Sequence, residues 1–153
     1  MRQVVIFFAT GLYSGYVPKA PGTAGSIVGL LLGWGVFCRL WNPWPAAFAV
    51  LFVVMFLLAC WIAGRAEHIF GSHDSPHIVI DEVLGMLAAM FMIPTSWPFL
   101  LGSFLLFRFF DILKPFPAGV IDRRVGGGFG VMLDDVAAGI YANIVLQVLR
   151  HAI

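Results

Sequence analysis

Acidic side chains are few in this sequence, and all eight lie between Glu67 and Asp135. Five of them directly adjoin apolar runs: Asp81, Glu82, Asp111, Asp134 and Asp135. A carboxylate at the edge of a hydrocarbon layer loses hydration, and neighbouring carboxylates repel each other, so both effects disfavour the charged form. A bound divalent cation offsets both effects, and Mg²⁺ takes hard oxygen ligands of this kind. The pattern therefore predicts a Mg²⁺ site formed by these five residues.

The two adjacent pairs, Asp81-Glu82 and Asp134-Asp135, also have a simpler interpretation. Each pair precedes an apolar run, where the positive end of a helix dipole stabilises acidic side chains. Asp111 does not fit this interpretation, because it ends the run that begins at Pro98 and would lie near a helix C-terminus. Asp111 is therefore the carboxylate that most clearly indicates a metal ligand.

Arg108 and Lys114 flank Asp111 three residues away on either side, so one helix face would present all three. These residues could form an internal salt-bridged face. Alternatively, Asp111 binds the metal while the two cations bind the oxygens of a phosphate group.

A loop of small residues, Pro18 to Ser26, leads directly into the first long apolar run. Free backbone N–H groups at a helix start bind anions, which would make Thr23 and Ser26 part of a phosphate site. Ordinary helix capping by either side chain is the alternative. The repeated small residues also suggest that another group approaches this backbone closely.

Histidine and cysteine form weaker patterns. His68, His73 and His77 lie near Asp74 at irregular spacing, which favours solvated loop residues over metal ligands. Cys38 and Cys60 each lie within an apolar stretch, which is typical of buried thiols.

The elements that position these residues are those of a membrane protein. The chain is 61% hydrophobic and 11% charged, whereas soluble domains average about 45–50% and about 25%. Uncharged runs at 20–38, 45–63 and 136–149 are expected to be membrane helices, the last one short unless it begins at Asp134. Between them, residues 65–82 form a polar segment and glycines 126–130 a loop. A net charge of +1 without a basic run argues against nucleic acid as a partner.

The remaining uncharged run, 83–107, is interrupted by Pro94 and Pro98 and could be a helical hairpin or a single crossing. We prefer the hairpin, because it brings every acidic cluster to one face of the membrane. The positive-inside tendency then makes that face cytoplasmic. We therefore predict an all-α, polytopic membrane bundle of about five or six helices, including a proline-broken hairpin, with residues 1–153 forming one membrane-embedded domain.

Four motifs resemble those of the phosphatidylglycerophosphatase A family and occur in that family's order. They are Pro21–Ser26, His73-Asp74 with 78–85, 107–117 and 127–139. The resemblance covers the chain from about residue 11 to about residue 142. It implies Mg²⁺-dependent hydrolysis of phosphatidylglycerophosphate to phosphatidylglycerol and phosphate in a bacterial inner membrane, as a step of phospholipid biosynthesis.

The resemblance also implies roles for single residues. Asp81, Asp111 and Asp134 would be catalytic, and the phosphate would be bound by Thr23, Ser26, Arg108 and Lys114. As a mechanistic hypothesis of our own, Asp134 accepts the proton of the attacking water. An aspartate nucleophile remains open, as do the number of metal ions and the oligomeric state. The alternatives to this enzyme are a lipid phosphotransferase, whose Asp-Gly-x₂-Ala-Arg pattern is absent, and a small transporter of divalent cations or phosphate with carboxylates along its pathway.

Overall fold

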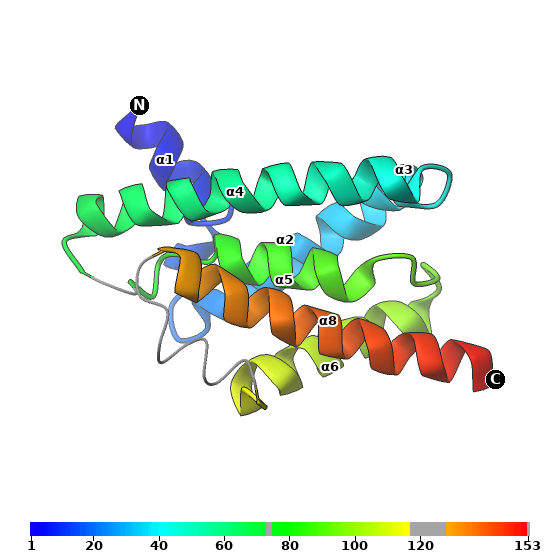
Figure 1. Ribbon diagram of the computed structural model, residues 1–153. Coiled ribbons are helices and arrows are strands. Elements are labelled where there is room, and N and C mark those ends of the chain that lie inside the picture. Colours follow the sequence, from blue (N-terminus) through cyan, green and yellow to red (C-terminus); the bar gives the residue numbers. More distant parts are fainter. Residues whose placement is uncertain (73–74, 117–127, 153) are drawn as a thin grey trace.

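The computed structural model of the protein describes residues 1–72, 75–116 and 128–152. Every regular element in those residues is helical, which confirms the predicted all-α fold (Figure 1). The α-helices are α1 (Arg2–Ala9), α2 (Pro21–Leu32), α3 (Cys38–Trp41), α4 (Pro45–Phe70), α5 (Ile80–Met90), α6 (Trp97–Leu113) and α8 (Gly128–Ala152). A 3₁₀ turn, η1 (Ser14–Tyr16), precedes α2, and a π-helical segment, η2 (Gly33–Phe37), joins α2 to α3.

Three helices are long and apolar enough to cross a membrane: Pro21–Trp41, Pro45–Phe70 and Met132–Ala152. Large apolar side chains of α4 point outward, since Val50 is 67% exposed and Leu57 is 56% exposed. A helix that is apolar on its outer faces is typical of a lipid environment. The three helices correspond to the predicted spans.

The predicted polar segment 65–82 begins inside a helix, because α4 continues to Phe70. The helix ends at Gly71, whose φ of 68° is the left-handed conformation common at helix C-termini. Arg65 and His68 are exposed, in agreement with a polar segment, but the prediction of His68 as a loop residue is wrong.

The start of α8 also differs from the prediction. This helix begins at Gly128, inside the glycine stretch that predicted a loop. The ring of Phe129 packs edge-on against Phe56 of α4, with centroids 5.5 Å apart. Tertiary contact of this kind can override the poor helix propensity of glycine. Asp134 and Asp135 consequently lie beyond the first turn of α8, so the helix-start interpretation of this pair is wrong.

The predicted hairpin is confirmed. Its first helix, α5, ends at Met90, and α6 begins at Trp97 with Pro98 in its first turn. Figure 1 shows the two helices running in opposite directions from the turn that joins them. The start of α5 and the end of α6 therefore lie at the same end of the bundle, and the single-crossing alternative is wrong.

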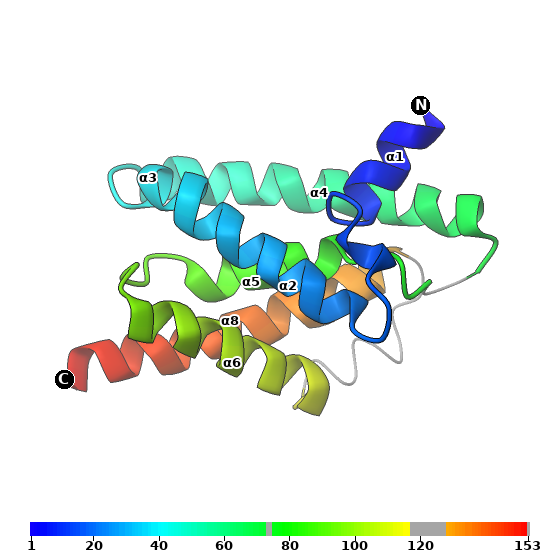
Figure 2. The same cartoon turned by 180° about the vertical axis from the view of Figure 1, so that it is seen from behind.

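The N-termini of α2, α5 and α8 and the C-termini of α4 and α6 lie at that end of the bundle (Figures 1 and 2). The opposite end holds α3, the turn between α5 and α6, and the C-terminus of the chain. The positive ends of three helix dipoles thus point toward one region, which favours acidic side chains and anions there. We call this region the carboxylate end.

Glycines allow the central helix, α5, to pack closely against its neighbours. Eight of its eleven residues are buried. On α2, Gly25 and Gly29 are four residues apart, the spacing of close helix contacts in membranes. A Cβ at Gly29 would lie 2.7 Å from the carbonyl oxygen of Val83, and one at Gly139 of α8 would overlap the carbonyl oxygen of Gly85.

Gly139→Ala should destabilise the protein, because the added methyl group meets backbone that cannot move aside as a flexible side chain can. Overpacking of this kind costs about 1–3 kcal/mol, measured as a lower thermal unfolding midpoint in detergent. Gly35→Ala is the control, since nothing lies within 4 Å of a Cβ at Gly35. Equal midpoints for the two variants would contradict the close crossing of α5 and α8.

Candidate functional site

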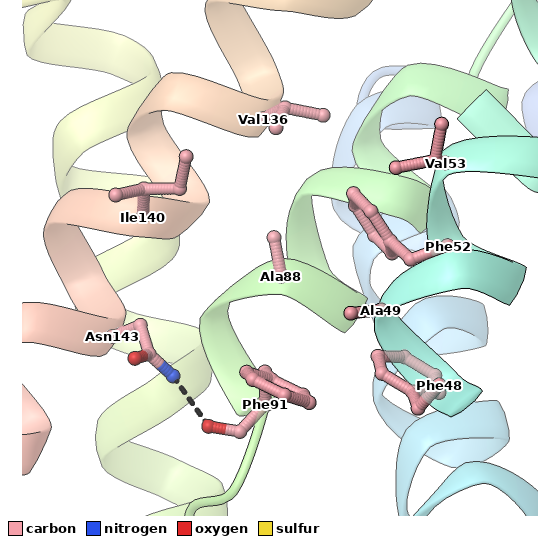
Figure 3. Close-up of a pocket in the computed structure, with 9 residues that line it drawn as sticks. All are labelled: Phe48, Ala49, Phe52, Val53, Ala88, Phe91, Val136, Ile140 and Asn143. Atoms are coloured by element: carbon pink, nitrogen blue, oxygen red, sulfur yellow. Dashed lines mark hydrogen bonds between the residues drawn. The ribbon is translucent and has the colours of Figure 1, made fainter. Parts of the chain in front are cut away.

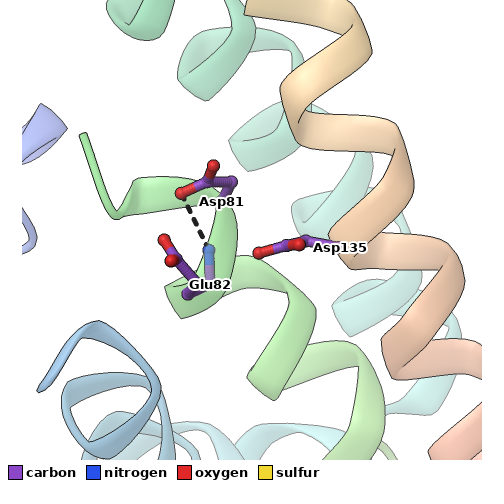
Figure 4. Close-up of side chains that lie close together, drawn as sticks. All are labelled: Asp81, Glu82 and Asp135. Atoms are coloured by element: carbon purple, nitrogen blue, oxygen red, sulfur yellow. Dashed lines mark hydrogen bonds between the residues drawn. The ribbon is translucent and has the colours of Figure 1, made fainter. Parts of the chain in front are cut away.

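Three carboxylates meet at the carboxylate end. Asp81 and Glu82 come from the first turn of α5, and Asp135 reaches toward them from α8 (Figure 4). Each can offer one oxygen such that all three oxygens lie within 4.8 Å of one another. Asp81 is 7% exposed and Asp135 is 5% exposed, so both are held away from water. We call these three residues the acidic triad.

Burial and mutual repulsion disfavour the charged forms of the carboxylates in the acidic triad. Burial raises the pKa of Asp81 well above its usual range, and the negative charge of Glu82 raises it further. Burial also raises the pKa of Glu82, against a smaller opposing effect of Arg108. Among the described residues, Glu82 Oε2 and Asp135 Oδ2 are buried and have no hydrogen-bond partner.

A divalent cation fits this donor set. An unsatisfied buried polar atom costs about 1–3 kcal/mol, and more when it is charged. The triad offers converging carboxylate oxygens, and among the described residues Glu82 Oε2 and Asp135 Oδ2 lack a hydrogen-bond partner. Carboxylate oxygens are ligands that Mg²⁺ accepts. The dipole of α5 alone does not account for the triad. Asp135 comes from α8 and lies well past the first turn of that helix, where the dipole of α8 gives a carboxylate little stabilisation.

Asp111 lies beside the triad, in the last turn of α6. Its charge acts on both Glu82 and Asp135. Its carboxylate oxygen forms an ion pair with Arg108 at 2.7 Å, which is the i,i+3 contact that the sequence suggested. Asp111 therefore interacts both with the acidic triad and with Arg108.

Lys114 does not continue this helix face. The helix α6 ends at Leu113, and Lys114 takes a left-handed conformation with φ of 44°. Its ammonium instead forms an ion pair with Asp134 at 2.5 Å. The prediction of one continuous face of Arg108, Asp111 and Lys114 is thus wrong in its second half. Asp134 and its neighbour Asp135 thus have different partners: Asp134 pairs with Lys114, and Asp135 belongs to the triad.

The start of α2 forms the other wall of the site. Ala20 is the N-cap without a side-chain cap, and the helix begins at Pro21. The first hydrogen bond of the helix runs from Ala24 N to Ala20 O, so the N–H groups of Gly22 and Thr23 precede it. These N–H groups border a cavity of about 340 Å³, which is also lined by Asp81, Glu82 and Arg108.

Neither capping prediction for α2 holds. Thr23 lies in the first turn, and Ser26 is fully buried within the helix. The hydroxyl of Ser26 donates to Gly22 O at 2.8 Å and accepts a long hydrogen bond from Arg108 at 3.4 Å. Its position fits a residue that orients Arg108 rather than one that contacts a ligand directly.

Gly22 is a site residue to which the sequence assigned no role. A Cβ at this position would overlap Glu82 Oε1 and lie 3.4 Å from the Arg108 guanidinium. The glycine therefore lets the backbone of α2 touch the acidic triad and its cation. The repetition of small residues in this loop was the only signal of such an approach in the sequence. Ser75 and Pro76, which also line the cavity, carried no such signal.

The histidines do not contribute to the described site. The Nδ1 of His77 lies 3.0 Å from the carbonyl oxygen of Gly15, and its ring packs near Tyr16, so it is not a solvated loop residue. His73, Asp74, Arg123 and Arg124 lie outside the described residues.

A separate cavity of about 300 Å³ lies between α4 and α8 (Figure 3). Its lining is apolar apart from Asn143, which donates to the carbonyl oxygens of Phe91 at 2.7 Å and Ala89 at 3.0 Å. These hydrogen bonds satisfy backbone carbonyl groups at the C-terminal end of α5. The cavity offers no acid or base from its lining residues and is not the functional site.

Comparison with known proteins agrees with this geometry. A model of the family described as phosphatidylglycerophosphatase A matches residues 7–150. The phosphatidylglycerophosphatase A of Haemophilus influenzae is 41% identical over 144 residues, which are 94% of this chain and 86% of the relative. That of Escherichia coli is 32% identical over 144 residues, 94% of this chain and 81% of the relative.

A protein of Bacteroides thetaiotaomicron named putative phosphatidylinositol-3-phosphatase is 34% identical over 155 residues, 97% of this chain and 94% of the relative. No solved structure matches the chain.

Proposed function

The chain belongs to the phosphatidylglycerophosphatase A family, and from this membership we propose that it hydrolyses phosphatidylglycerophosphate to phosphatidylglycerol and phosphate with the help of Mg²⁺. The observation that supports the metal is the acidic triad, with its converging oxygens and its two buried oxygens that lack a partner among the described residues. Asp81, Glu82 and Asp135 are the proposed ligands. Asp111 is the proposed fourth, because its charge already acts on two of them.

The phosphate would lie in the cavity between the triad and the start of α2. The N–H groups of Gly22 and Thr23 point the positive end of a helix dipole at this cavity, a typical anion site. Arg108 supplies a planar guanidinium with donors for phosphate oxygens. Its ion pair with Asp111 and its contact with Ser26 hold it in this position.

When bound, Mg²⁺ would neutralise charge on the phosphate oxygens and make the attacking water easier to deprotonate. Asp134 is the proposed acceptor of the proton that this water loses as its oxygen bonds to phosphorus. The bond from phosphorus to the glycerol oxygen breaks, and that oxygen leaves as a hydroxyl group after Asp134 returns the proton to it. The ion pair with Lys114 holds the Asp134 carboxylate in place. In this proposal Lys114 acts through Asp134, which differs from the phosphate contact that the resemblance implied for it.

We propose that the protein lies in the bacterial inner membrane as a multi-pass protein with its carboxylate end in the cytoplasm. Support comes from the distribution of cations, which favours the cytoplasmic side in membrane proteins. Among the described cations outside α1, Lys19 precedes α2, Arg65 lies toward the C-terminus of α4, and Arg108 and Lys114 lie at the end of α6, so these belong to the carboxylate end. Arg39 of α3 and Arg150 near the C-terminus of α8 belong to the opposite end.

The transporter alternative is not favoured, because the family and the compared relatives are named for phosphatase activity. The name of the Bacteroides relative makes phosphatidylinositol 3-phosphate a useful second substrate in any assay.

Removing divalent metal from the purified protein should abolish phosphate release. We expect EDTA to lower the rate on phosphatidylglycerophosphate in detergent micelles by more than about a hundredfold, and added Mg²⁺ to restore it. Phosphatidylinositol 3-phosphate, assayed in parallel, tests the headgroup. Activity that survives EDTA would refute the metal proposal, and metal-replete protein that releases no phosphate from phosphatidylglycerophosphate would refute the function.

A further inference from the structure

A second, wholly apolar groove lies between α2 and α6, on the face of the bundle seen in Figure 2. Its volume is about 290 Å³. Four of its lining residues come from α2 and η2, ending at Trp34, and four come from α6, beginning at Trp97. The groove is open on its outer side, since Ile27 is 44% exposed and Leu101 is 42% exposed.

This groove continues the proposed phosphate cavity along the same two helices. Thr23 lines the cavity and Ile27, one helical turn further along α2, lines the groove. On α6, Arg108 lines the cavity and Phe104, one turn away in the same direction, lines the groove. Polar and apolar sites thus follow each other along one path.

The path from the phosphate cavity along the groove is about as long as one leaflet of a bilayer is deep. The groove residues of α6, from Trp97 to Phe104, span about 10 Å at about 1.5 Å per residue, and the path from Arg108 to Trp97 is about 16 Å. Half of a hydrocarbon core of about 30 Å is about 15 Å. A lipid whose phosphate lies beside Arg108 would therefore have much of one hydrocarbon chain alongside this groove.

We propose that the groove between α2 and α6 binds an acyl chain of the lipid substrate. The proposal rests on the proposed function and adds the part of the site that holds the hydrophobic end of the substrate. The apolar cavity of about 460 Å³ among α1, α2, α4 and α5 is larger, but α6 contributes no residue to its lining. The cavity in Figure 3 is lined by α4, α5 and α8, and neither α2 nor α6 contributes a residue to its lining.

Leu101→Trp tests the groove by filling it about 10 Å from Arg108, beyond the reach of a four-carbon chain. We expect the variant to raise KM for dioleoyl phosphatidylglycerophosphate in micelles by about tenfold, which corresponds to losing the burial of roughly two methylene groups. KM for the dibutyryl substrate should stay within twofold. Leu105→Trp is the matched control, because Leu105 lies one turn away on α6, is 56% exposed and does not line the groove. This control should behave as the wild type on both substrates.

A second measurement uses the wild-type protein and needs no variant. A phosphatidylglycerophosphate with a diazirine at the end of one acyl chain should cross-link to 27–34 or 97–104, and unlabelled substrate should suppress the product. Cross-links confined to α4 or α8, or equal effects of Leu101→Trp on both chain lengths in folded protein, would overturn the proposal. Wild-type protein that hydrolyses neither chain length would instead overturn the proposed function.

Discussion

Asp135→Asn should lower kcat/KM by about a thousandfold and raise the Mg²⁺ concentration for half-maximal activity by more than tenfold. Removing one member of a buried charge pair costs about 3–5 kcal/mol, and about 1.4 kcal/mol corresponds to a factor of ten. Asp135 is 5% exposed and lies beside Asp81 and Glu82. Water therefore has little access to the position and cannot compensate for the loss of its charge. The measurement is phosphate release across a Mg²⁺ titration.

The neighbouring residue supplies a matched control for this prediction. Asp134 is equally buried but forms an ion pair with Lys114 instead of joining the triad. Asp134→Asn should lower kcat while leaving the half-saturating Mg²⁺ concentration within about threefold, because an acceptor of the water's proton is lost and a metal ligand is not. If Asp134→Asn shifted the Mg²⁺ dependence as strongly as Asp135→Asn, the proposed division of roles between these neighbours would be wrong.

Arg108→Gln should lower kcat/KM by about a hundredfold. Hydrogen bonds to charged groups contribute about 1.5–3 kcal/mol each, and the guanidinium offers donors at the wall of the phosphate cavity. Arg108→Lys should recover only part of the activity, because an ammonium keeps the charge and loses the planar fork. Arg65→Gln is the control, since Arg65 is an exposed cation of α4 that packs over Trp61, away from the described site.

The ion pair of Arg108 with Asp111 allows a second explanation for such a loss, and the variant that conserves the charge separates the two. If Arg108 served only to neutralise Asp111, then Arg108→Lys would keep the wild-type activity, because a lysine ammonium supplies the same charge. We expect only partial activity, because the ammonium lacks the planar fork that binds phosphate oxygens. Thermal unfolding midpoints within a few degrees of the wild type would show that the variants are folded.

Several features of the protein follow from local sequence. An apolar composition with few charges predicts membrane helices, and the structure contains three helices that are long and apolar enough to cross. Pro94 and Pro98 predict the break between α5 and α6, because proline cannot continue a helix from within. The helical spacing of Arg108 and Asp111 predicts their ion pair. Each of these rests on residues within a few positions of each other.

Helix ends were harder to predict because distant packing moves them. Phe129 packs on Phe56 and draws a glycine stretch into α8. Further along α8, Asp135 meets Asp81 and Glu82 of α5, and Lys114, just after the end of α6 at Leu113, pairs with Asp134. No local pattern contains these partners, since they are separated by 20 residues or more along the chain.

Apolar composition is enough to predict a helical membrane protein, and the position of the carboxylates is enough to predict that they need a partner. Which carboxylates meet depends on how the helices pack. The packing around α5 is close because Gly22, Gly29 and Gly139 bring neighbouring backbones together. Side chains of α5 and α8 and the start of α2 can then form one site. A glycine allows close helix packing only where another helix lies against it, and the local sequence does not show which helix that is.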